Sequence, residues 1–395
     1  MKQPTSRDRL LMAMSQKEPD HIPCSFMSFT IMRHRCNDNW YEVALKEKEM
    51  GLDPFLFIPT APRSQRRDHP DLRGLPVRFH PDVKVKQWRE SNPEGYDFLQ
   101  KEYTTPAGSL STHIRITEDW PHGDHLPFID DYQIPRTTKP LITQPSDLEA
   151  LKYLLIPPQA ADVGKFKQDA EKAAAFSHEH GILLAGGWGV GMDMVDWLCG
   201  MESLMVLTME QPEFVSDLLE MIHQWNKQRM RVVLDSPVDI YIRRAWYEGC
   251  DFVTPRFYRK AILPRLKAEV DLAHEHGKKF GYICSSGTKP MLDLHVEAGI
   301  DVLIGVDPIQ GTHTDLPLMK QKFTNKISIW GGVSGAVTVE RGSEADVREA
   351  VHHAISTLGP NGFILSPVDN LTVDDPLTWK NIDIFIDEWK NHWTK

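Results

Sequence analysis

The sequence predicts an α/β fold, a (β/α)₈ barrel with a long cap insertion after the second strand. Short apolar runs, rich in β-branched and aromatic residues, alternate with amphipathic segments over most of the chain. Strands that are apolar on both faces are typical of a parallel sheet covered by helices. Eight such runs, with segments between them long enough for right-handed helical crossovers, indicate a closed barrel.

The eight predicted strands cover His21–Phe29, Asp53–Thr60, Ile182–Trp188, Val238–Ala245, Lys278–Cys284, Val302–Pro308, Ile327–Val333 and Gly362–Val368. The clearest predicted helices are Val163–His180, Pro212–Leu234, Arg256–His276 and Ser343–Leu358. Three of these helices stop before a glycine, and Pro212–Leu234 begins with proline and glutamate. Both are ordinary helix-end signals.

Residues 60–160 break the alternation of strands and helices. They are rich in proline and polar residues with scattered aromatics, and only Gly108–Ile116 shows a weak strand pattern. No periodicity in this stretch predicts a core of its own. We therefore interpret residues 60–135 as a cap insertion over the barrel mouth, within a single barrel domain that covers residues 1–395.

Composition excludes several classes of function. The net charge of −10 argues against a nucleic-acid-binding surface, and the arginines between Arg63 and Arg89 alternate with aspartates. Five scattered cysteines without a CxxC pair indicate reduced thiols in a cytoplasm. Nothing approaches the length of a membrane span.

Side chains at the carboxyl ends of barrel strands converge on one catalytic space. The predicted ends carry Trp188, Arg243, Arg244, Tyr247, Glu248, Tyr282, Cys284, Asp307, Trp330 and Asp369. Each residue type also has an ordinary structural explanation. Cys284 can be a small buried side chain, and Glu248 can be a salt-bridge partner of Arg243 or Arg244. Asp307 and Asp369 can form turns, and the tryptophans can be core residues. The Gly186–Gly189 motif matches no known phosphate-binding spacing.

The convergence of these groups has a chemical meaning. A thiolate, as Cys284 can supply, beside a carboxylate suits zinc, which takes sulfur and oxygen ligands in tetrahedral geometry. Glu248, Tyr247 and Tyr282 are candidate catalytic proton donors. Arg243 would favour an anionic substrate, and Trp188 and Trp330 would favour a flat one. Asp369 completes the candidate substrate-binding set.

These residues resemble the uroporphyrinogen decarboxylase superfamily, including its corrinoid-linked methyltransferase branch. Arg7–Leu11, Pro19–Pro23, Thr254–Pro255 and Trp330–Val333 fit in order along the chain. The branch's usual zinc ligands, a His-x-Cys and a second Cys, correspond here to Tyr282, Cys284 and Ser366. Asp307 lies where related cobalamin-independent methionine synthases use a carboxylate ligand. The resemblance implies either a rebuilt zinc site of Cys284, Asp307 and Glu248 or no metal.

The resemblance also implies a function. We expect a methyltransferase that moves a methyl group from a small methylated substrate, a methoxylated aromatic, amine or thiol, to a corrinoid carried by a partner protein. Two alternatives stay open at this stage. One is a lyase of the uroporphyrinogen decarboxylase type, and the other is a non-catalytic ligand-binding barrel.

Overall fold

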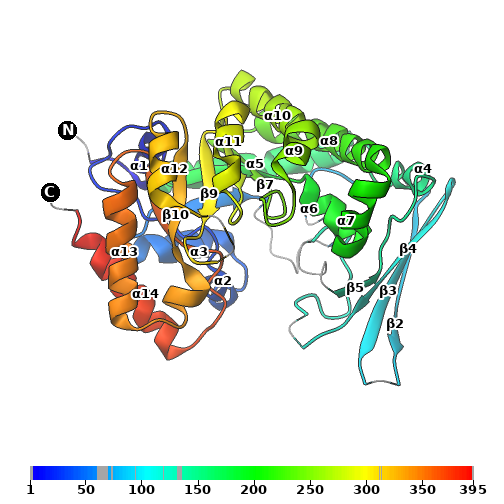
Figure 1. The fold of residues 1–395 in the computed structure, drawn as a ribbon, viewed down its shortest axis with the longest axis horizontal. Helices are drawn as coiled ribbons and strands as arrows, with labels where there is room; N and C mark the ends of the chain where they lie inside the picture. Colours follow the sequence, from blue (N-terminus) through cyan, green and yellow to red (C-terminus); the bar gives the residue numbers. More distant parts are fainter. Residues whose placement is uncertain are drawn as a thin grey trace. The chain divides into compact units, whose positions relative to one another are not determined.

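The computed structural model describes residues 3–59, 70–72, 74–93, 95–118, 120–130, 136–310, 312 and 314–393. The chain forms two compact units (Figure 1). The first unit consists of Met1–Pro62, Gln168–Gly189 and Val233–Lys395, and the second of Arg63–Lys167 and Val190–Val232. Each unit has its own β-sheet, and we describe the two in turn.

The first unit is built on a parallel sheet of seven strands in the order β1-β6-β7-β8-β9-β10-β11. The strands are β1 (Phe55–Ile58), β6 (Leu183–Gly189), β7 (Ile240–Arg244), β8 (Lys279–Ile283), β9 (Val302–Val306), β10 (Ser328–Ser334) and β11 (Phe363–Val368). Seven of the eight predicted strands are therefore confirmed, in the predicted order. Predicted residue Thr60 lies outside the described residues.

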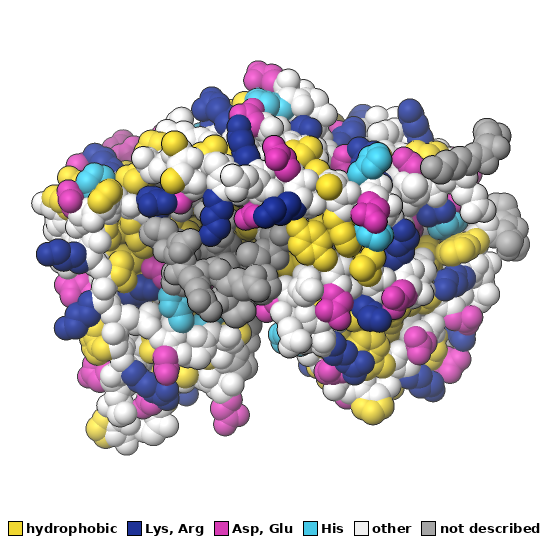
Figure 2. Space-filling view, turned by 180° about the vertical axis from the view of Figure 1, so that it is seen from behind, with side chains coloured by type: hydrophobic (Ala, Val, Ile, Leu, Met, Phe, Trp, Pro, Cys, Tyr) yellow, Lys and Arg dark blue, Asp and Glu magenta, His cyan; other side chains and the backbone are white. Residues whose placement is uncertain are grey.

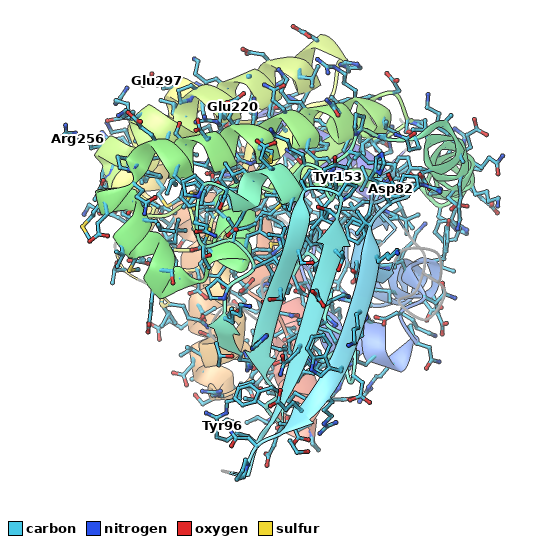
Figure 3. All side chains as sticks on the ribbon, turned by 90° about the vertical axis from the view of Figure 1, so that its right-hand side faces the viewer. Asp82, Tyr96, Tyr153, Glu220, Arg256 and Glu297 are labelled. Carbon is cyan, nitrogen blue, oxygen red and sulfur yellow. The ribbon has the colours of Figure 1, made fainter. Side chains whose placement is uncertain are left out.

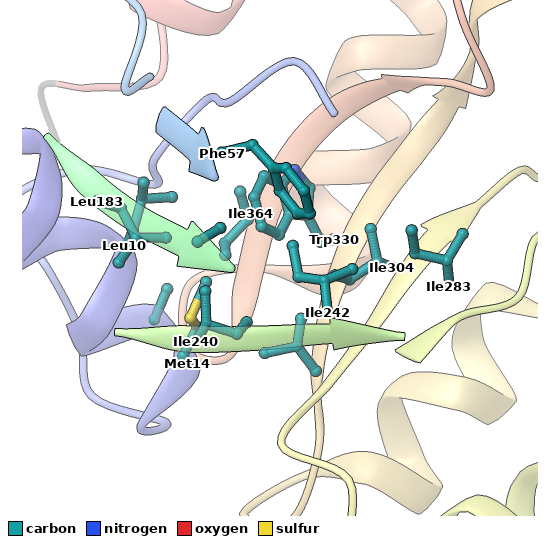
Figure 4. Close-up of a cluster of buried hydrophobic side chains, with 13 residues drawn as sticks. Leu10, Met14, Phe57, Leu183, Ile240, Ile242, Ile283, Ile304, Trp330 and Ile364 are labelled. Carbon is teal, nitrogen blue, oxygen red and sulfur yellow. The ribbon is translucent and has the colours of Figure 1, made fainter. Parts of the chain in front are cut away.

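The sheet is strongly curled. All seven strands contribute to one buried apolar cluster, which includes Phe57, Ile242, Ile304, Trp330 and Ile364 (Figure 4). Phe55 of β1 contacts the Trp330 ring of β10 edge to face, with ring centroids 5.3 Å apart. Strands far apart in the sheet order can meet in this way only if the sheet bends around its own apolar face.

The prediction of a strand over His21–Phe29 is wrong. This segment forms a single parallel bridge, between Cys24 and Leu365 of β11. Pro23 has no N–H to donate to a sheet ladder, which limits regular pairing. The segment nevertheless hydrogen-bonds to the chain on both sides of it. The Ser25 N–H donates to the Leu365 carbonyl of β11 (3.0 Å), and the N–H of Asp53, just before β1, donates to the Cys24 carbonyl (2.7 Å). The parallel sheet of the first unit therefore has a bridging segment in place of an eighth strand.

Helices surround this sheet. Those assigned wholly to the first unit are α1 (Ser6–Met14), α2 (Thr30–Arg35), α3 (Trp40–Glu49), α9 (Pro255–Phe257), η4 (Tyr258–Ile262), α10 (Leu263–Glu275), η5 (Lys289–Met291), α11 (Leu292–Ala298), α12 (Leu316–Phe323), η6 (Gly335–Val339), α13 (Glu344–Leu358) and α14 (Pro376–Lys390). Helices α10 and α13 pack on the outer face of the sheet. Helix α1 places Leu10 and Met14 in the inner cluster, and Ala13 accepts a hydrogen bond from Ser328 at the start of β10. The amino-terminal end of the strands is thereby covered, which leaves the carboxyl end for a site.

Two long helices, α5 (Ala160–His180) and α8 (Pro212–Leu234), have residues in both units. The second unit also contains η2 (Pro70–Leu72), β2 (Lys84–Ser91), β3 (Asp97–Thr105), β4 (Gly108–Arg115), β5 (Thr137–Lys139), α4 (Asp147–Leu151), α6 (Met192–Cys199) and α7 (Met201–Glu210). Its four strands form an antiparallel sheet in sequence order. Figure 3 shows Tyr96 at the hairpin end of β2 and β3, with Asp82 and Tyr153 at the opposite end.

The second unit has a core that the sequence did not reveal. Leu99, Ile114, Trp120 and Leu126 form a buried apolar cluster. The buried Lys101 ammonium donates to Asp71 and to the Leu126 carbonyl, both at 2.6 Å. A charged residue at a core position hides the alternation that predicts a strand. Of the predicted cap, residues 60–135, the stretch 63–135 belongs to the second unit, which also includes 136–167 and 190–232. Its action as a cap over the barrel stays a prediction, and residues 60–69 and 131–135 lie outside the described residues.

The surface agrees with the composition. Figure 2 shows Lys and Arg side chains interspersed with Asp and Glu on the face that it presents. None of the helices formed by the described residues is both long and apolar enough to cross a membrane.

Candidate active site

The carboxyl end of β6 carries an unusual backbone conformation. Trp188 has a φ of +64°, in the left-handed region that a bulky side chain rarely adopts. The pairing register between β6 and β7 shifts between Gly187 and Gly189, so Trp188 is the bulged residue. A Cβ at Gly187 would lie 2.6 Å from the Ile242 carbonyl oxygen, which explains why glycine precedes the bulge. The glycines of this motif thus serve close strand packing and turn the indole of Trp188 out of the regular pleat.

Trp188 belongs to a group of three side chains at this end of the sheet. The Arg244 guanidinium lies 5.2 Å from the Trp188 ring and 5.1 Å from the Trp246 ring. The two indoles contact each other edge to face at 5.9 Å, and both pack against the inner cluster while staying partly exposed. A planar cation held between two aromatic faces gains from both electrostatics and stacking. We call Trp188, Arg244 and Trp246 the aromatic triad.

Arg243 and Tyr282, both predicted as site residues, lie on the other face of the sheet. Side chains alternate along a strand, and the inner cluster takes Ile242 and Ile283 but neither of these two residues. The Arg243 guanidinium instead donates to Glu248 at 2.7 Å and lies 3.3 Å from Glu269 of α10. Glu248 is fully buried, so the salt-bridge alternative weighed for it is what the structure contains.

Two tyrosines extend this buried network. Tyr282 donates a hydrogen bond to the second carboxylate oxygen of Glu248, and Tyr258 of η4 donates to the Tyr282 hydroxyl at 3.1 Å. Burial, and then the Glu248 charge, raises the pKa of both tyrosines well above the ordinary value, so both stay protonated donors. Burial lowers the pKa of Arg243, but Glu248 and Glu269 outweigh burial and the net pKa is raised. The network therefore holds Arg243 in its charged form and both tyrosines in their protonated forms.

His295 of α11 packs against both tyrosines, with ring centroids 5.6 Å from Tyr282 and 6.0 Å from Tyr258. It is fully buried, and burial lowers its pKa to about 3. His295 is therefore neutral over the physiological range and acts as a packing element of this network.

Cys284 follows β8 and is completely buried. Its thiol lies 3.7 Å from the Ser286 carbonyl. Two glycines hold this loop against the loop after β7: a Cβ at Gly249 would lie 2.0 Å from the Ser286 oxygen, and one at Gly287 would lie 2.4 Å from the Cys250 nitrogen. The strand ends that carry Glu248 and Cys284 are thereby locked side by side.

The remaining predicted residues are dispersed. Asp307 accepts hydrogen bonds from the backbone of Ile309 (2.7 Å) and Gln310 (2.9 Å), the turn role weighed for it. Burial raises its pKa, with those bonds opposing. Trp330 is 1% exposed and donates to the Ser25 carbonyl at 2.8 Å, as a core tryptophan does. Tyr247 packs on Phe252 at 5.0 Å, and Asp369 follows β11, partly buried.

The three predicted metal ligands do not form a cluster. Among the residues that the structure describes, potential ligand atoms from three residues come within 4.8 Å of one another only at His352, Glu388 and His392. Glu248 already binds Arg243 and Tyr282 through its two oxygens. Ser366, at the position of the family's second cysteine, is buried and its hydroxyl accepts from the Met27 backbone at 3.1 Å. This arrangement does not fit a zinc ion held by Cys284, Asp307 and Glu248.

Sequence reasoning missed Arg244 as a site residue, together with Tyr258, Glu269 and His295. The sequence places Arg244 at a strand end, but only the register decides which arginine faces the inner cluster. Tyr258, Glu269 and His295 come from helices, where no strand-end rule points to them.

Among solved structures, the fold resembles that of a methyltransferase from Methanosarcina mazei. The two are 13% identical with a TM-score of 0.64, over 99% of this chain and 100% of that chain. A B12-independent methionine synthase from a Shewanella species, in complex with selenomethionine, is 9% identical with a TM-score of 0.46, over 94% and 97%. That second likeness is too weak to support an inference. No curated protein sequence matches this one.

The match to a family is much more specific than these likenesses. The model of the uroporphyrinogen decarboxylase family matches residues 122–392, which include strands β6–β11 and both faces of the curled sheet. The match therefore covers the aromatic triad and the buried network, as well as most of the chain. The chain belongs to the uroporphyrinogen decarboxylase family.

Proposed function

We propose that this protein is a methyltransferase that takes a methyl group from a small methoxylated aromatic compound and delivers it to a corrinoid carried by a partner protein. The aromatic triad is the observation that carries this proposal. It lies at the carboxyl end of the strands, where enzymes built on such sheets bind substrates. Its two partly exposed indoles suit a flat ring, and the buried Arg244 guanidinium, 1% exposed, holds these two indoles in place.

The strain at Trp188 supports a functional assignment. A left-handed conformation at a residue other than glycine costs about 1–2 kcal/mol, and such residues concentrate at ligand sites. The bulge aims the Trp188 indole at Arg244 and Trp246. A core tryptophan would need no such backbone distortion.

The chemistry asked of this chain is limited. A corrinoid, when bound, supplies a cobalt nucleophile that accepts the methyl group. The protein then has to position the substrate and help the departing oxygen. The triad would orient the ring, and Tyr247, which follows Trp246, is the nearest of the predicted proton donors in the sequence. Glu248 and Tyr282 would support this strand end through the buried network.

Zinc stays a prediction from the family resemblance, and we route no step through it. Metal analysis of the purified protein, together with a Cys284→Ala variant, tests it directly. Zinc that copurifies with the wild type and is lost in this variant would restore the predicted Cys284 site.

Two coarser features of the proposal concern the fold and the compartment. We propose a closed barrel in which residues 23–25 take the place of an eighth strand, since they hydrogen-bond to β11 and to Asp53. We also propose a cytoplasmic location, because all five cysteines are free in the structure and none is more than partly exposed.

The test is a methyl-transfer assay with purified protein, reduced cobalamin as the acceptor and a panel of methoxybenzoates, methylamines and methanethiol. We expect methylcobalamin to form, seen by its absorbance, with methoxybenzoates only. Trp246→Ala should raise the KM about 2- to 12-fold, which is the ~0.5–1.5 kcal/mol of an aromatic pair. Trp88→Ala, on β2 of the second unit, is the matched control and should leave the KM unchanged.

Other results would favour the alternatives. Carbon dioxide release from a porphyrinogen, without methyl transfer, would identify a lyase of the decarboxylase type. Binding of aromatic ligands without turnover of either kind would identify a ligand-binding barrel. Methyl transfer that is indifferent to Trp246→Ala would remove the aromatic triad from the site.

A further inference from the structure

The outer surface of the first unit carries a group of side chains that the proposed activity does not use. Glu388 lies in the last turn of α14, and His392 follows that helix. The two are four residues apart, and His392 Nε2 lies 3.3 Å from Glu388 Oε1. Across from them, His352 of α13 has its ring centroid 5.3 Å from that of His392. One ligand atom from each of these three residues lies within 4.8 Å of the others.

We propose that His352, Glu388 and His392 bind a zinc-class divalent cation, and that the ion fixes the carboxyl-terminal turn to α13. Two imidazoles and one carboxylate form a ligand set that first-row metals such as zinc prefer, whereas magnesium prefers oxygen ligands alone. With three protein ligands, water would complete a tetrahedral site. The proposal is independent of the aromatic triad and of the predicted zinc at Cys284.

The surrounding charges favour a cation at this place. Arg348 of α13 binds the other Glu388 oxygen, Oε2, at 3.1 Å, which leaves Oε1 directed at His392. Arg348 also contacts Asp387 (2.9 Å) and Glu344 (3.2 Å). Three carboxylates thus surround one arginine, with Lys380 as the second cation, 3.7 Å from Glu344. The cluster keeps an excess of negative charge that a divalent ion would offset.

The turn that the ion would hold has a structural task. Trp393, next to His392, stacks on His21 with ring centroids 4.1 Å apart. Trp389 of α14 donates to the Ile22 carbonyl at 2.7 Å. Residues 21 and 22 lead directly into the segment that hydrogen-bonds to β11 and to Asp53. A metal ion at His392 would therefore stabilise the bridging segment of the sheet.

The experiment is equilibrium dialysis of the full chain against zinc chloride, followed by metal analysis, with four variants. His352→Ala and His392→Ala should each lose one zinc per chain, and so should Glu388→Gln. His353→Ala is the matched control, because His353 is an exposed histidine of the same helix outside the cluster, and it should keep the wild-type stoichiometry.

A second readout separates a site from weak surface adsorption. A ligand that binds only the folded state raises the midpoint of thermal unfolding. Zinc should raise the unfolding midpoint of the wild type and of His353→Ala, but not that of His352→Ala. Magnesium should raise the unfolding midpoint of none of these three proteins. Equal zinc content in all four variants, or loss of zinc in His353→Ala as well, would overturn the proposal.

Discussion

Arg243 and Arg244 are neighbours in the chain, yet their side chains serve different parts of the molecule. Arg244 contacts Trp188 and Trp246 at the carboxyl end of the sheet, and Arg243 binds Glu248 and Glu269 under the helices. A strand changes face at every residue, so one position decides between a contact with two indoles and a buried ion pair. The sequence shows which residues end each strand but not the register that divides them between the faces.

Glu248 is the residue where the structural and catalytic interpretations differ most sharply. Glu248→Gln would leave Arg243 with only Glu269 as a charged partner. Truncating a buried ion pair costs up to about 3–5 kcal/mol, and with Glu269 still present we expect ~2–3 kcal/mol. The midpoint of thermal unfolding of Glu248→Gln should therefore fall clearly.

Tyr282→Phe removes the hydrogen bond to Glu248, so it should lower the free energy of unfolding by about 1 kcal/mol, which thermal melts measure.

A purely catalytic Glu248 would behave differently. Turnover would be lost in Glu248→Gln while the unfolding midpoint stayed at the wild-type value. That pair of results would contradict the structural role, and the assay described above measures turnover on the same preparations.

Glu47 of α3 gives a prediction about pH. It is buried, and burial alone raises its pKa from 4.5 to about 8. The folded state therefore holds this proton more tightly than the unfolded state does. The free-energy cost of ionising the buried Glu47 carboxyl is absent below pH 4.5, grows between pH 4.5 and 8, and is complete above pH 8, at roughly 5 kcal/mol.

Glu47→Gln removes the ionisable group with little change of shape. We expect the variant to unfold at a higher temperature than the wild type at pH 8.5 and at about the same temperature at pH 4.5. Parallel thermal melts at the two pH values measure this difference. A gain of equal size at both pH values would point to packing rather than ionisation.

At the scale of elements, helix ends are the features that the sequence predicted best. Predicted Pro212–Leu234 is α8, and predicted Ser343–Leu358 is α13 with Ser343 as its N-cap in a capping box with Asp346. Local signals define such ends, and they act without tertiary context. Strand β3 was missed because its buried positions include polar residues, Lys101 above all, which only a partner such as Asp71 makes tolerable. Strand β2 was missed because none of its residues is buried, so it has no apolar face to produce an alternating pattern.

The interlocked loops after β7 and β8 give a prediction at this scale. A Cβ at Gly287 would meet two backbone nitrogens at 2.4 and 2.6 Å, and its φ is +62°. Gly277, at the end of α10, has a similar φ of +67° with nothing within 4 Å of the added atom. Gly277→Ala should cost about 1 kcal/mol for the left-handed backbone alone.

Gly287→Ala should cost at least twice that amount, because the backbone of Cys250 and Asp251 has to move as well. Thermal melts of the two variants compare them directly. Equal unfolding midpoints would show that the two loops separate easily and do not hold Glu248 beside Cys284.

At the scale of the whole molecule, the chain contains two compact units, and a single barrel domain with a cap insertion stays a prediction. The second unit is assembled from two stretches, Arg63–Lys167 and Val190–Val232, that are separated in the sequence by α5 residues and β6. Ile142 donates to the Leu198 carbonyl at 2.9 Å, which joins the two stretches. No local pattern reveals a contact between Ile142 and Leu198, 56 residues apart, so the extent of this unit could not be predicted.

This assembly predicts how fragments behave. A fragment of residues 60–135 would contain β2, β3 and β4 but not β5, which pairs with β4. It would also lose the Arg78–Asp162 ion pair and the hydrogen bond from His80 to the Tyr153 carbonyl at 2.8 Å. A three-stranded sheet with one face uncovered has too little buried apolar surface to fold alone. We expect no cooperative unfolding transition from this fragment in urea.

A longer fragment, residues 60–232, carries all of the second unit and is the matched comparison. It should unfold cooperatively, because both stretches and their shared hydrogen bond are present. Circular dichroism as a function of urea concentration measures both fragments. A sigmoidal transition in residues 60–135 would mean that the antiparallel sheet is an independent domain. The interpretation of that stretch as a dependent insertion would then be wrong, because a cap that folds by itself needs no barrel to support it.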